Sequence, residues 1–280
     1  IPAKVKYNGV VYDVTAVGRK AFADASELTG VIFPAGVMKV GAFAFDNCAH
    51  LSKLIFPGNA MDFEEGAFFR CPSICNVTFG SDWRNVDLKL FQWSDSLRTL
   101  RIPAKMSKIH NLKSLAHLEA VDVDPNNASF ASKAGLLYNR EMSVLYGCPL
   151  SYSGSVCVQE GVTEIYRGAL SDCVNVTDVT LPASLEKMSY LEFAGSKSLR
   201  SVTILSEVPF FNAVQNGKEC FTLRIPEGSK VVLYVQKQSK KAFKESLKYD
   251  SLEFSEIGED NVRKLDAKEI VSGKILKTIK

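Results

Sequence analysis

An internal repeat with a period of about 23 residues constrains the fold of this chain more than any other feature. The segments "LTGVIFP" at Leu28, "LSKLIFP" at Leu51 and "LRTLRIP" at Leu97 align directly. Their central apolar residues begin a register of nine positions, which are Val31, Leu54, Val77, Leu100, Val121, Val156, Val179, Val202 and Leu223. Chance does not place nine residues in one register, so the chain is predicted to build one structural unit many times.

Two further sets of apolar residues keep the same spacing. One set, usually a Phe after Ala, is Phe22, Phe45, Phe68, Phe91, Leu170 and Phe193, and the other is Val17, Val40, Phe63, Val86, Ile109, Ile165 and Met188. The repeat ends in an alternating Val–x–Ile segment, which is typical of a strand. A Pro follows that segment at Pro34, Pro57, Pro103, Pro182 and Pro226 and ends the strand, because it lacks an N–H donor. The segment around the Phe is too short for a full helix and indicates one tight helical turn.

These patterns predict a repeat solenoid. A single turn of this length cannot cover its own apolar side chains, whereas stacked turns share a continuous core. We therefore expect a right-handed β-solenoid, or horseshoe, with short helical turns and a parallel sheet on one face. Trp83 aligns with the apolar residues Val37, Met106 and Leu185, so we predict that its ring lies in the core.

Two inserts interrupt the register. Residues 6–13 lengthen the first turn, and Asn8-Gly9 within them is a strong hairpin signal. Residues 124–155 lengthen a later turn, and "GLLYNREMSVLYGCP" within them predicts two short strands around Asn139–Met142.

The repeat array is expected to cover residues 1–227 and to be followed by a C-terminal capping segment over residues 228–257. The register stops after Leu223, and "SKKAFKESLKY" predicts an amphipathic helix that begins near Ser239. Residues 258–280 are charged and irregular, and we expect a tail or a cap strand there.

The repeat resembles that of the BspA-like leucine-rich-repeat family of bacterial surface proteins. The residues that carry the resemblance are "VGAFAFDNCAHLSKLIFP" (residues 40–57) and "IYRGALSDCVNVTDVTLP" (residues 165–182). The opening segment, the insert and "FTLRIPEGS" are similar to the family's usual entry, insert and array end. The resemblance implies a leucine-rich-repeat fold, export from the cell and, for some members, adhesion to host matrix proteins or other cells. The repeat that carries Trp93 and Ser94 departs from the family pattern, because its neighbours have small residues and Cys there.

Composition and charge exclude several classes of function. The formal net charge of +3 is too small to indicate nucleic acid as a partner. No apolar run reaches the roughly 18 residues that a transmembrane helix needs. The chain begins at Ile1, which fits a signal peptide already removed or a segment boundary. An extracellular or cell-surface location is the expectation.

The cysteines are predicted to be structural. Cys48, Cys71 and Cys173 occupy one repeat position, which other repeats fill with Ala25, Ser94 and Ser196. A position that accepts Cys, Ala or Ser favours a small buried side chain, so we expect buried free thiols.

The sequence contains no constellation that indicates catalysis. Cys71 and Cys75 have CxxxC spacing, but no second pair or nearby His completes a zinc site. The three His, at His50, His110 and His117, lie at different repeat positions and cannot be assumed to converge. No phosphate-binding, dinucleotide-binding, zinc-protease or serine-hydrolase motif is present. We therefore predict no enzyme, no cofactor and no metal site.

The remaining candidate is the exposed face of the predicted sheet. Because side chains alternate along a strand, the residue between two core positions points outward. These outward residues are Ile32, Ile55, Thr78, Arg101, Asp122, Cys157, Thr180, Thr203 and Arg224, with Lys53, Arg98, Glu119 and Arg200 leaning outward beside them. Ordinary solvated strand surface is the competing interpretation of this face.

The candidate binding residues chosen from this face are Arg98, Arg101, Glu119, Asp122, Trp93, Thr180, Arg200 and Thr203. The two Arg on one strand and the two acidic residues on the next form a mixed-charge patch, which can orient a partner and speed its association. Trp93 holds a turn position usually given to a small residue. An exposed Trp is a typical interface anchor, although the ring can equally fold back over a repeat edge.

The predicted function is a cell-surface or secreted protein-interaction module, adhesin-like and without catalysis, whose partner is a protein on a host or neighbouring cell. One alternative is a glycan-binding or glycan-handling surface protein, which exposed aromatic side chains gathered on one face would favour. A structural spacer that only holds another domain away from the cell is the second alternative. The sequence does not identify the ligand.

Overall fold

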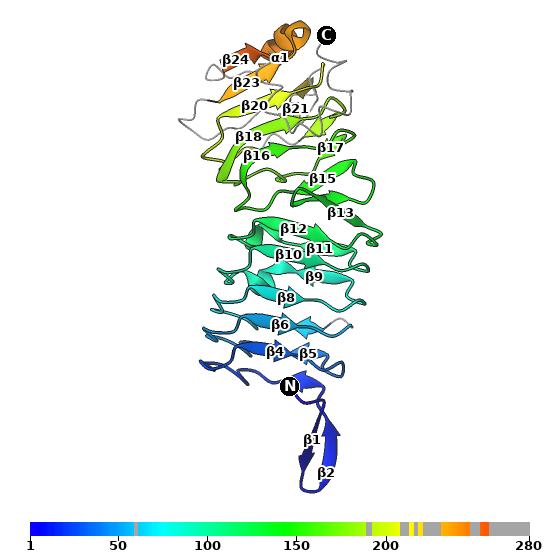
Figure 1. Ribbon diagram of the computed structural model, residues 1–280, viewed down its shortest axis with the longest axis vertical. Coiled ribbons are helices and arrows are strands. Elements are labelled where there is room, and N and C mark those ends of the chain that lie inside the picture. Colours follow the sequence, from blue (N-terminus) through cyan, green and yellow to red (C-terminus); the bar gives the residue numbers. More distant parts are fainter. Residues whose placement is uncertain are drawn as a thin grey trace. The chain divides into compact units, whose positions relative to one another are not determined.

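The computed structural model describes residues 1–58, 61–188, 192–207, 213–215, 218–220, 231–246 and 253–257. The chain divides into two compact units, Ile1–Arg140 and Glu141–Lys280, and each is described by itself. Within each unit the chain winds in stacked turns, and a regular turn contains a short strand, a tight reversal and a second strand (Figure 1).

In the first unit the strands form two parallel ladders. The short-strand ladder comprises β3 (Ala16–Val17), β5 (Lys39–Val40) and β7 (Asp62–Phe63), and then β9 (Asn85–Asp87) with β11 (Lys108–His110). The long-strand ladder comprises β4 (Gly30–Ile32), β6 (Lys53–Ile55) and β8 (Asn76–Thr78), and then β10 (Thr99–Ile102) with β12 (Ala120–Val123). We expected a parallel sheet on one face only. The structure has a second parallel ladder, because the residues around Val17 and Val40 also pair as strands.

The predicted register is confirmed within each ladder. Val31 pairs with Leu54 and Leu54 with Val77, while Leu100 pairs with Val121. The step from Val77 to Leu100 differs, since β8 and β10 belong to separate sheets. Backbone pairing thus stops once in each ladder, at the same boundary between turns.

The core of this unit contains stacked Phe rings at repeat spacing. Phe22 and Phe45 stack with their ring centroids 5.1 Å apart, and Phe45 and Phe68 follow at 5.2 Å. A second column stacks Phe33 on Phe56 at 5.2 Å, and the two columns meet edge to face where Phe33 lies 5.8 Å from Phe45. Offset and edge-to-face ring contacts add attraction beyond the burial of apolar surface, so neighbouring turns bind each other through these columns.

The reversals between the strands are single tight turns, as predicted. The amide of Ala23 donates to the carbonyl of Lys20 three residues before it, and the amide of Phe22 donates to Ala44 O of the next turn. Two reversals close as 3-10 helices, η1 (Leu88–Phe91) and η2 (Leu112–Ser114).

The shared Cys position does more than provide a small side chain. Cys48 Sγ donates to Phe22 O at 3.1 Å, and Cys71 Sγ donates to Phe45 O at 3.0 Å. In the second unit Ser196 Oγ donates to Leu170 O at 3.2 Å. In these three turns the position supplies a small donor that satisfies a carbonyl of the preceding turn.

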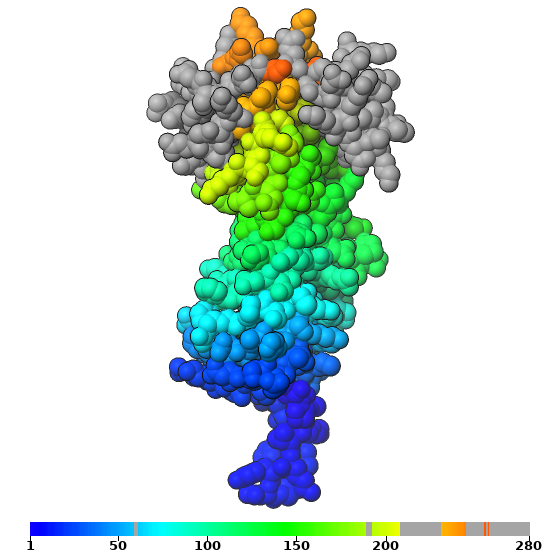
Figure 2. Space-filling view, turned by 60° about the vertical axis from the view of Figure 1, so that its left-hand side comes forward, coloured from blue at the N-terminus to red at the C-terminus, as the bar shows by residue number. Residues whose placement is uncertain are grey.

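A β-hairpin is present at each of the two inserts. β1 (Lys4–Tyr7) and β2 (Val10–Asp13) pair antiparallel, and Asn8 and Gly9 between them have φ of 48° and 83°, as a type I′ turn requires. Figure 2 shows this hairpin, in dark blue, standing clear of the first turns. The hairpin signal at Asn8-Gly9 is confirmed.

The longer insert contains the two expected strands and one more before them. β13 (Phe130–Lys133) pairs antiparallel with β14 (Leu136–Asn139), and β15 (Val144–Gly147) follows in the second unit. The sequence predicted β14 and β15 but missed β13. The buried Asn127 fixes the start of this hairpin, because its side-chain oxygen accepts from the amides of Ser129 and Phe130.

The second unit repeats the two parallel ladders. The short strands are β15, β17 (Glu164–Ile165) and β19 (Lys187–Met188), and the long strands are β16 (Ser153–Cys157), β18 (Asn175–Leu181), β20 (Ser201–Ile204), β23 (Val232–Val235) and β24 (Glu253–Glu256). An antiparallel pair, β21 (Ala213–Gln215) and β22 (Lys218–Cys220), precedes β23, while η3 (Lys237–Ser239) and α1 (Lys240–Ser246) follow it.

The expected end of the array is wrong. Leu223 was expected to follow Val202 in the ladder, but Leu233 pairs with Val202, and β24 extends the sheet by another strand. The longer chain segment before β23 explains the difference, because it moves the next matching strand beyond the regular spacing. Leu223, Arg224 and residues 258–280 lie outside the described residues, whereas the predicted helix is present as α1.

Replacement of Phe45 by Ala is expected to lower the free energy of unfolding by about 3–5 kcal/mol, because Phe45 is fully buried between Phe22 and Phe68. Cys48→Ala is the matched control in the same turn, and it should cost about 1 kcal/mol for one lost hydrogen bond. Urea denaturation of both variants measures the difference. Equal losses would show that the ring column does not hold the turns together.

Cys48, Cys71 and Cys173 are expected to resist a thiol reagent in the native protein, while the exposed Cys75 reacts rapidly. Burial raises the pKa of Cys71 to about 12 and also raises the pKa of Cys48. A raised pKa leaves little of the reactive thiolate at neutral pH. Peptide mapping after timed labelling gives the rate for each cysteine, and rapid native labelling of the three buried thiols would contradict their placement.

Candidate functional site

The predicted mixed-charge patch exists on the first unit. Arg101 on β10 lies in register with Asp122 on β12, and the two side chains form an ion pair of 3.9 Å. Arg98 and Glu119, just before these strands, form a second ion pair of 3.2 Å. All of these side chains are exposed, as the alternation along β10 and β12 predicts.

These ion pairs contribute little to folding. Exposed pairs are worth about 0–1 kcal/mol each, because water screens the charges and the long side chains lose freedom. Arg98 is held more firmly than Arg101, because its guanidinium also donates to Asp95 O at 2.5 Å.

The candidate residues in the second unit do not form one exposed surface. Arg200 is exposed and pairs with Asp178 at 3.7 Å, and Thr180 is half-buried. Thr203 lies between the core residues Val202 and Ile204 on β20, but it is only 9% exposed, so its expected exposure is wrong. It lies in register between Thr180 and Tyr234, and a short side chain flanked by a large ring presents little surface.

Trp93 remains at the surface and does not join the charged patch. Its side chain is 46% exposed, and its ring packs edge to face on Phe69 of the preceding turn, with centroids 5.1 Å apart. Trp93 and Phe69 line one groove, whereas Arg101 and Asp122 line another. The structure therefore separates two candidate surfaces that the sequence had combined.

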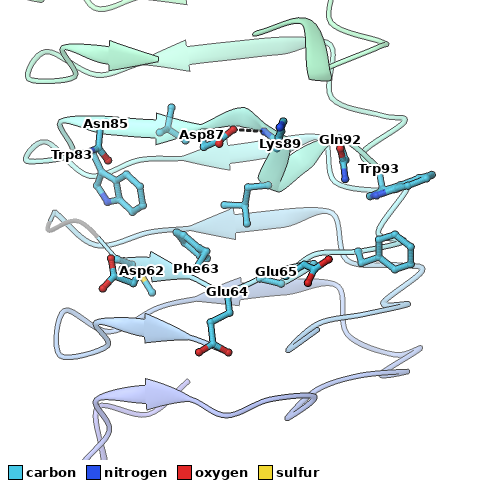
Figure 3. Close-up of a pocket in the computed structure, with 16 residues that line it drawn as sticks. Asp62, Phe63, Glu64, Glu65, Trp83, Asn85, Asp87, Lys89, Gln92 and Trp93 are labelled. Carbon is cyan, nitrogen blue, oxygen red and sulfur yellow. Dashed lines mark hydrogen bonds between the residues drawn. The ribbon is translucent and has the colours of Figure 1, made fainter. Parts of the chain in front are cut away.

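Both grooves lie at one boundary between turns, which we call the seam. It separates the turn that contains β7 and β8 from the turn that contains β9 and β10. The groove beside β7 and β9 has a volume of about 440 Å³, and we call it the seam groove. Its lower wall carries Asp62, Phe63, Glu64 and Glu65, and its upper wall carries Trp83, Asn85, Asp87, Lys89, Gln92 and Trp93 (Figure 3).

The backbone bonds that join other turns are missing across the short strands of the seam. At the preceding step, the amides of Asp62 and Glu64 donate to the carbonyls of Met38 and Val40. Repetition of that pattern would have Asn85 N and Asp87 N donate to Met61 O and Phe63 O. Neither bond forms among the described residues, and β7 and β9 belong to separate sheets.

Backbone bonds are also missing across the seam between the long strands β8 and β10. Phe33 N donates to Ile55 O and Phe56 N donates to Thr78 O, but the equivalent bond from Phe79 N to Arg101 O is absent. Here the second groove opens, with a volume of about 360 Å³. The seam is thus open on both faces of the stack.

The buried residue Ser94 also lacks a hydrogen bond across the seam. It occupies the shared Cys position, and by register its hydroxyl would donate to Phe68 O, as Cys71 donates to Phe45 O. Its Oγ is instead buried with no hydrogen-bond partner among the described residues. The two turns lie too far apart at this position for the bond that joins the other turns.

Side-chain volume explains the opening. Trp83 is buried, as predicted, where other repeats have Val37 or Met106, and its ring lies 5.4 Å from Phe56 and 6.3 Å from Phe63 of the turn below. Its Nε1 donates to Pro57 O at 2.5 Å. A ring this large in a position of medium size acts as a wedge between the turns. The Phe column also widens here, with Phe68 and Phe91 6.0 Å apart.

The seam groove is acidic. Four carboxylates, of Asp62, Glu64, Glu65 and Asp87, line it against the single cation of Lys89. A hydrogen bond from Lys39 lowers the pKa of Glu64. Burial opposes ionisation of Asp87, but hydrogen bonds from Asn111 and from the amide of Lys89 outweigh it and lower its pKa. These two carboxylates therefore stay charged at neutral pH.

Sequence reasoning missed the acidic residues of this groove. Asp62 and Asp87 lie in short strands that the sequence did not assign, and Glu64 and Glu65 directly follow the first of these strands. The available signal was Trp83, whose size departs from its repeat position, together with the exposed Trp93 in the same turn.

Neither a metal cluster nor a membrane-spanning helix is found in the part of the chain that the structure describes. The titratable groups described above form ion pairs, satisfy backbone amides or face solvent.

The comparisons with known proteins identify the repeat. The model of the BspA type leucine-rich repeat region matches residues 9–122 and 137–222 in six copies. The pneumococcal vaccine antigen PcpA is similar in structure, with 18% sequence identity, a TM-score of 0.48, and coverage of 92% of this chain and 88% of that chain. A leucine rich cell surface protein from Faecalibacterium prausnitzii has 17% identity and a TM-score of 0.41 over 94% and 88%. None of the curated proteins matches.

The amides of Asn85 and Asp87 are expected to exchange with deuterium roughly tenfold faster than those of Asp62 and Glu64, because only the latter pair is hydrogen-bonded to the preceding turn. Exchange followed by NMR or by fragment mass spectrometry resolves these amides. Equal protection of the two pairs would show that the seam is closed in solution.

Trp83→Met tests the wedge, since Met106 fills the same position in the next turn. The smaller side chain is expected to let the turns approach, so that the amides of Asn85 and Asp87 gain protection. Unchanged exchange in a folded Trp83→Met protein would mean that another contact holds the seam open.

Proposed function

Because the chain belongs to the BspA-type leucine-rich-repeat family, we propose that it is a non-catalytic protein-interaction module that works on a cell surface or as a secreted protein. In this proposal it acts as an adhesin-like binder of a protein on a host or neighbouring cell. The family resemblance supports export, and the solenoid supports binding, because stacked turns present an extended surface to a partner.

The observation that carries the proposal is the aromatic pair at the seam groove. Trp93 is half-exposed and held by Phe69, so its ring is already ordered before a partner arrives. A large, pre-ordered ring beside a concave surface loses little conformational freedom on binding and gains much buried area. The exposed charged patch around Arg98 and Arg101 is the second surface available to a protein partner.

A glycan-binding role is the second candidate, and the same groove favours it. The sequence analysis found no aromatic cluster on the exposed ladder, but the structure brings Trp93 and Phe69 together beside carboxylates that can accept hydrogen bonds from hydroxyl groups. A structural spacer would need neither the seam groove nor the exposed charged patch.

A binding assay on purified matrix proteins and whole cells distinguishes these functions. The wild-type chain is expected to bind at least one protein, and a glycan panel is tested in parallel. Binding to glycans alone would favour the second candidate, and binding to neither would favour the spacer.

Two variants then locate the contact. Arg98→Ala with Arg101→Ala is expected to weaken binding several-fold if the charged patch contributes, and Trp93→Ala is expected to weaken it if the seam groove contributes. The melting temperature of the Arg double variant should stay nearly unchanged, because its two ion pairs are exposed. Full binding by both variants would place the contact elsewhere, most simply on the 124–155 insert.

A further inference from the structure

The seam groove combines three properties that no other part of the described chain combines. It has strand edges without backbone partners, an excess of negative charge, and an ordered aromatic ring at its margin. Taken together, these properties define the chemistry of the segment that fits the groove.

The strand edges come first. Met61 O and Phe63 O on the lower side, and Asn85 N and Asp87 N on the upper side, make no hydrogen bond to a neighbouring turn among the described residues. β7 and β9 pair normally on their other sides, with β5 and β11, so each keeps the extended backbone of a sheet strand. Edges of this kind pair with an extended polypeptide, because the main-chain groups of a peptide repeat at the same spacing.

The charge comes second. Asp62 and Glu65 are exposed and form no ion pair within the described residues, and they add to Glu64 and Asp87. Four carboxylates and one Lys line the groove, and Lys39 beside it pairs with Glu64 at 2.6 Å, so the local formal charge is −2, whereas the whole chain carries +3. The negative charge is therefore local to the groove, and a concave surface lined by one sign of charge attracts the opposite sign.

The aromatic ring comes third. The half-exposed face of Trp93 offers a site for an ammonium or guanidinium group, since cations are attracted to the faces of aromatic rings. The molecule already uses this contact nearby, where the Arg70 guanidinium lies 5.3 Å from the centroid of Phe69. Arg70 is bound to Asp46 by two hydrogen bonds and does not neutralise the carboxylates of the groove.

We propose that the seam groove binds an extended, positively charged segment of a partner protein, which adds main-chain hydrogen bonds to the edges of β7 and β9. Lys or Arg side chains of the segment pair with Asp62 and Glu65, and one cation stacks on Trp93. This inference rests on the proposed function and names the chemistry of the partner segment. The wedge of Trp83 is what keeps the site open.

The test uses the full chain and a short fluorescent peptide of alternating lysine and threonine, capped at both ends. Fluorescence anisotropy is expected to show binding that weakens as salt is added. A peptide of alternating glutamate and threonine should not bind. The lysine peptide with N-methylated backbone amides should also fail to bind, because it keeps the charge but lacks the main-chain donors.

Two double variants with equal changes of net charge identify the groove. Asp62→Asn with Glu65→Gln is expected to weaken peptide binding about fivefold, since each exposed ion pair contributes modestly. Asp172→Asn with Glu186→Gln removes two exposed carboxylates of the second unit and should leave binding close to the wild-type value. Hydrogen exchange adds a direct readout, because the bound peptide should protect the amides of Asn85 and Asp87.

Other outcomes overturn the inference. If the N-methylated peptide binds as well as the unmodified one, or if Asn85 and Asp87 gain no protection, no strand is added at the seam. If only an oligosaccharide binds the groove, its ligand is a glycan. If a protein captured by the wild-type chain binds Asp62→Asn/Glu65→Gln equally well, the partner uses another surface, and the proposed function stands without this inference. If the wild-type chain captures no protein, the proposed function itself fails.

Discussion

The structure depends on the packing of each turn against its neighbours. A turn of about 23 residues has too few side chains to enclose its own apolar surface, so its Phe, Val and Leu residues are covered only when another turn lies above or below. The ring columns through Phe22, Phe45 and Phe68, and through Phe33 and Phe56, are the most direct expression of this dependence. Because strand pairing and ring stacking join mainly adjacent turns, a change at one step is confined largely to that step and its neighbours.

Hydrogen bonds add a second link between turns, and they report the distance between them. Where the turns are close, backbone amides reach the next carbonyl and the thiols of Cys48 and Cys71 reach the turn before. At the seam, the strands of the two turns do not pair and Ser94 Oγ has no partner among the described residues, although Ser96 N still donates to Pro72 O at 3.1 Å. Ring contacts still hold this step, since Phe68 and Phe91 remain stacked and Trp83 bonds to Pro57. Ring packing and these hydrogen bonds thus hold a step at which the strands themselves do not pair.

The proposed binding surface follows from this difference. A regular stack satisfies its own backbone and leaves a partner only side chains to contact. An open step exposes strand edges and places Asp62 of β7 and Asp87 of β9 on the two walls of one groove (Figure 3). The bonds missing at the seam cost stability, while the remaining ring contacts and the neighbouring regular turns keep the chain folded. A partner is therefore expected to bind at the seam, the step at which the strands of successive turns do not pair.

The sequence by itself determined the period, the stacking register within each ladder, the Asn8-Gly9 hairpin, the buried cysteines and the pairing of Arg101 with Asp122. All of these follow from local chemistry repeated at fixed spacing, so a one-dimensional pattern carries them. The second parallel ladder, the strand β13, the place of Leu233 beside Val202 and the burial of Thr203 were decided by tertiary structure. So was the seam groove, although Trp83 was correctly placed in the core. Spacing identifies which residues face the core, but only the packed structure shows whether a ring of that volume fits between two turns or forces them apart.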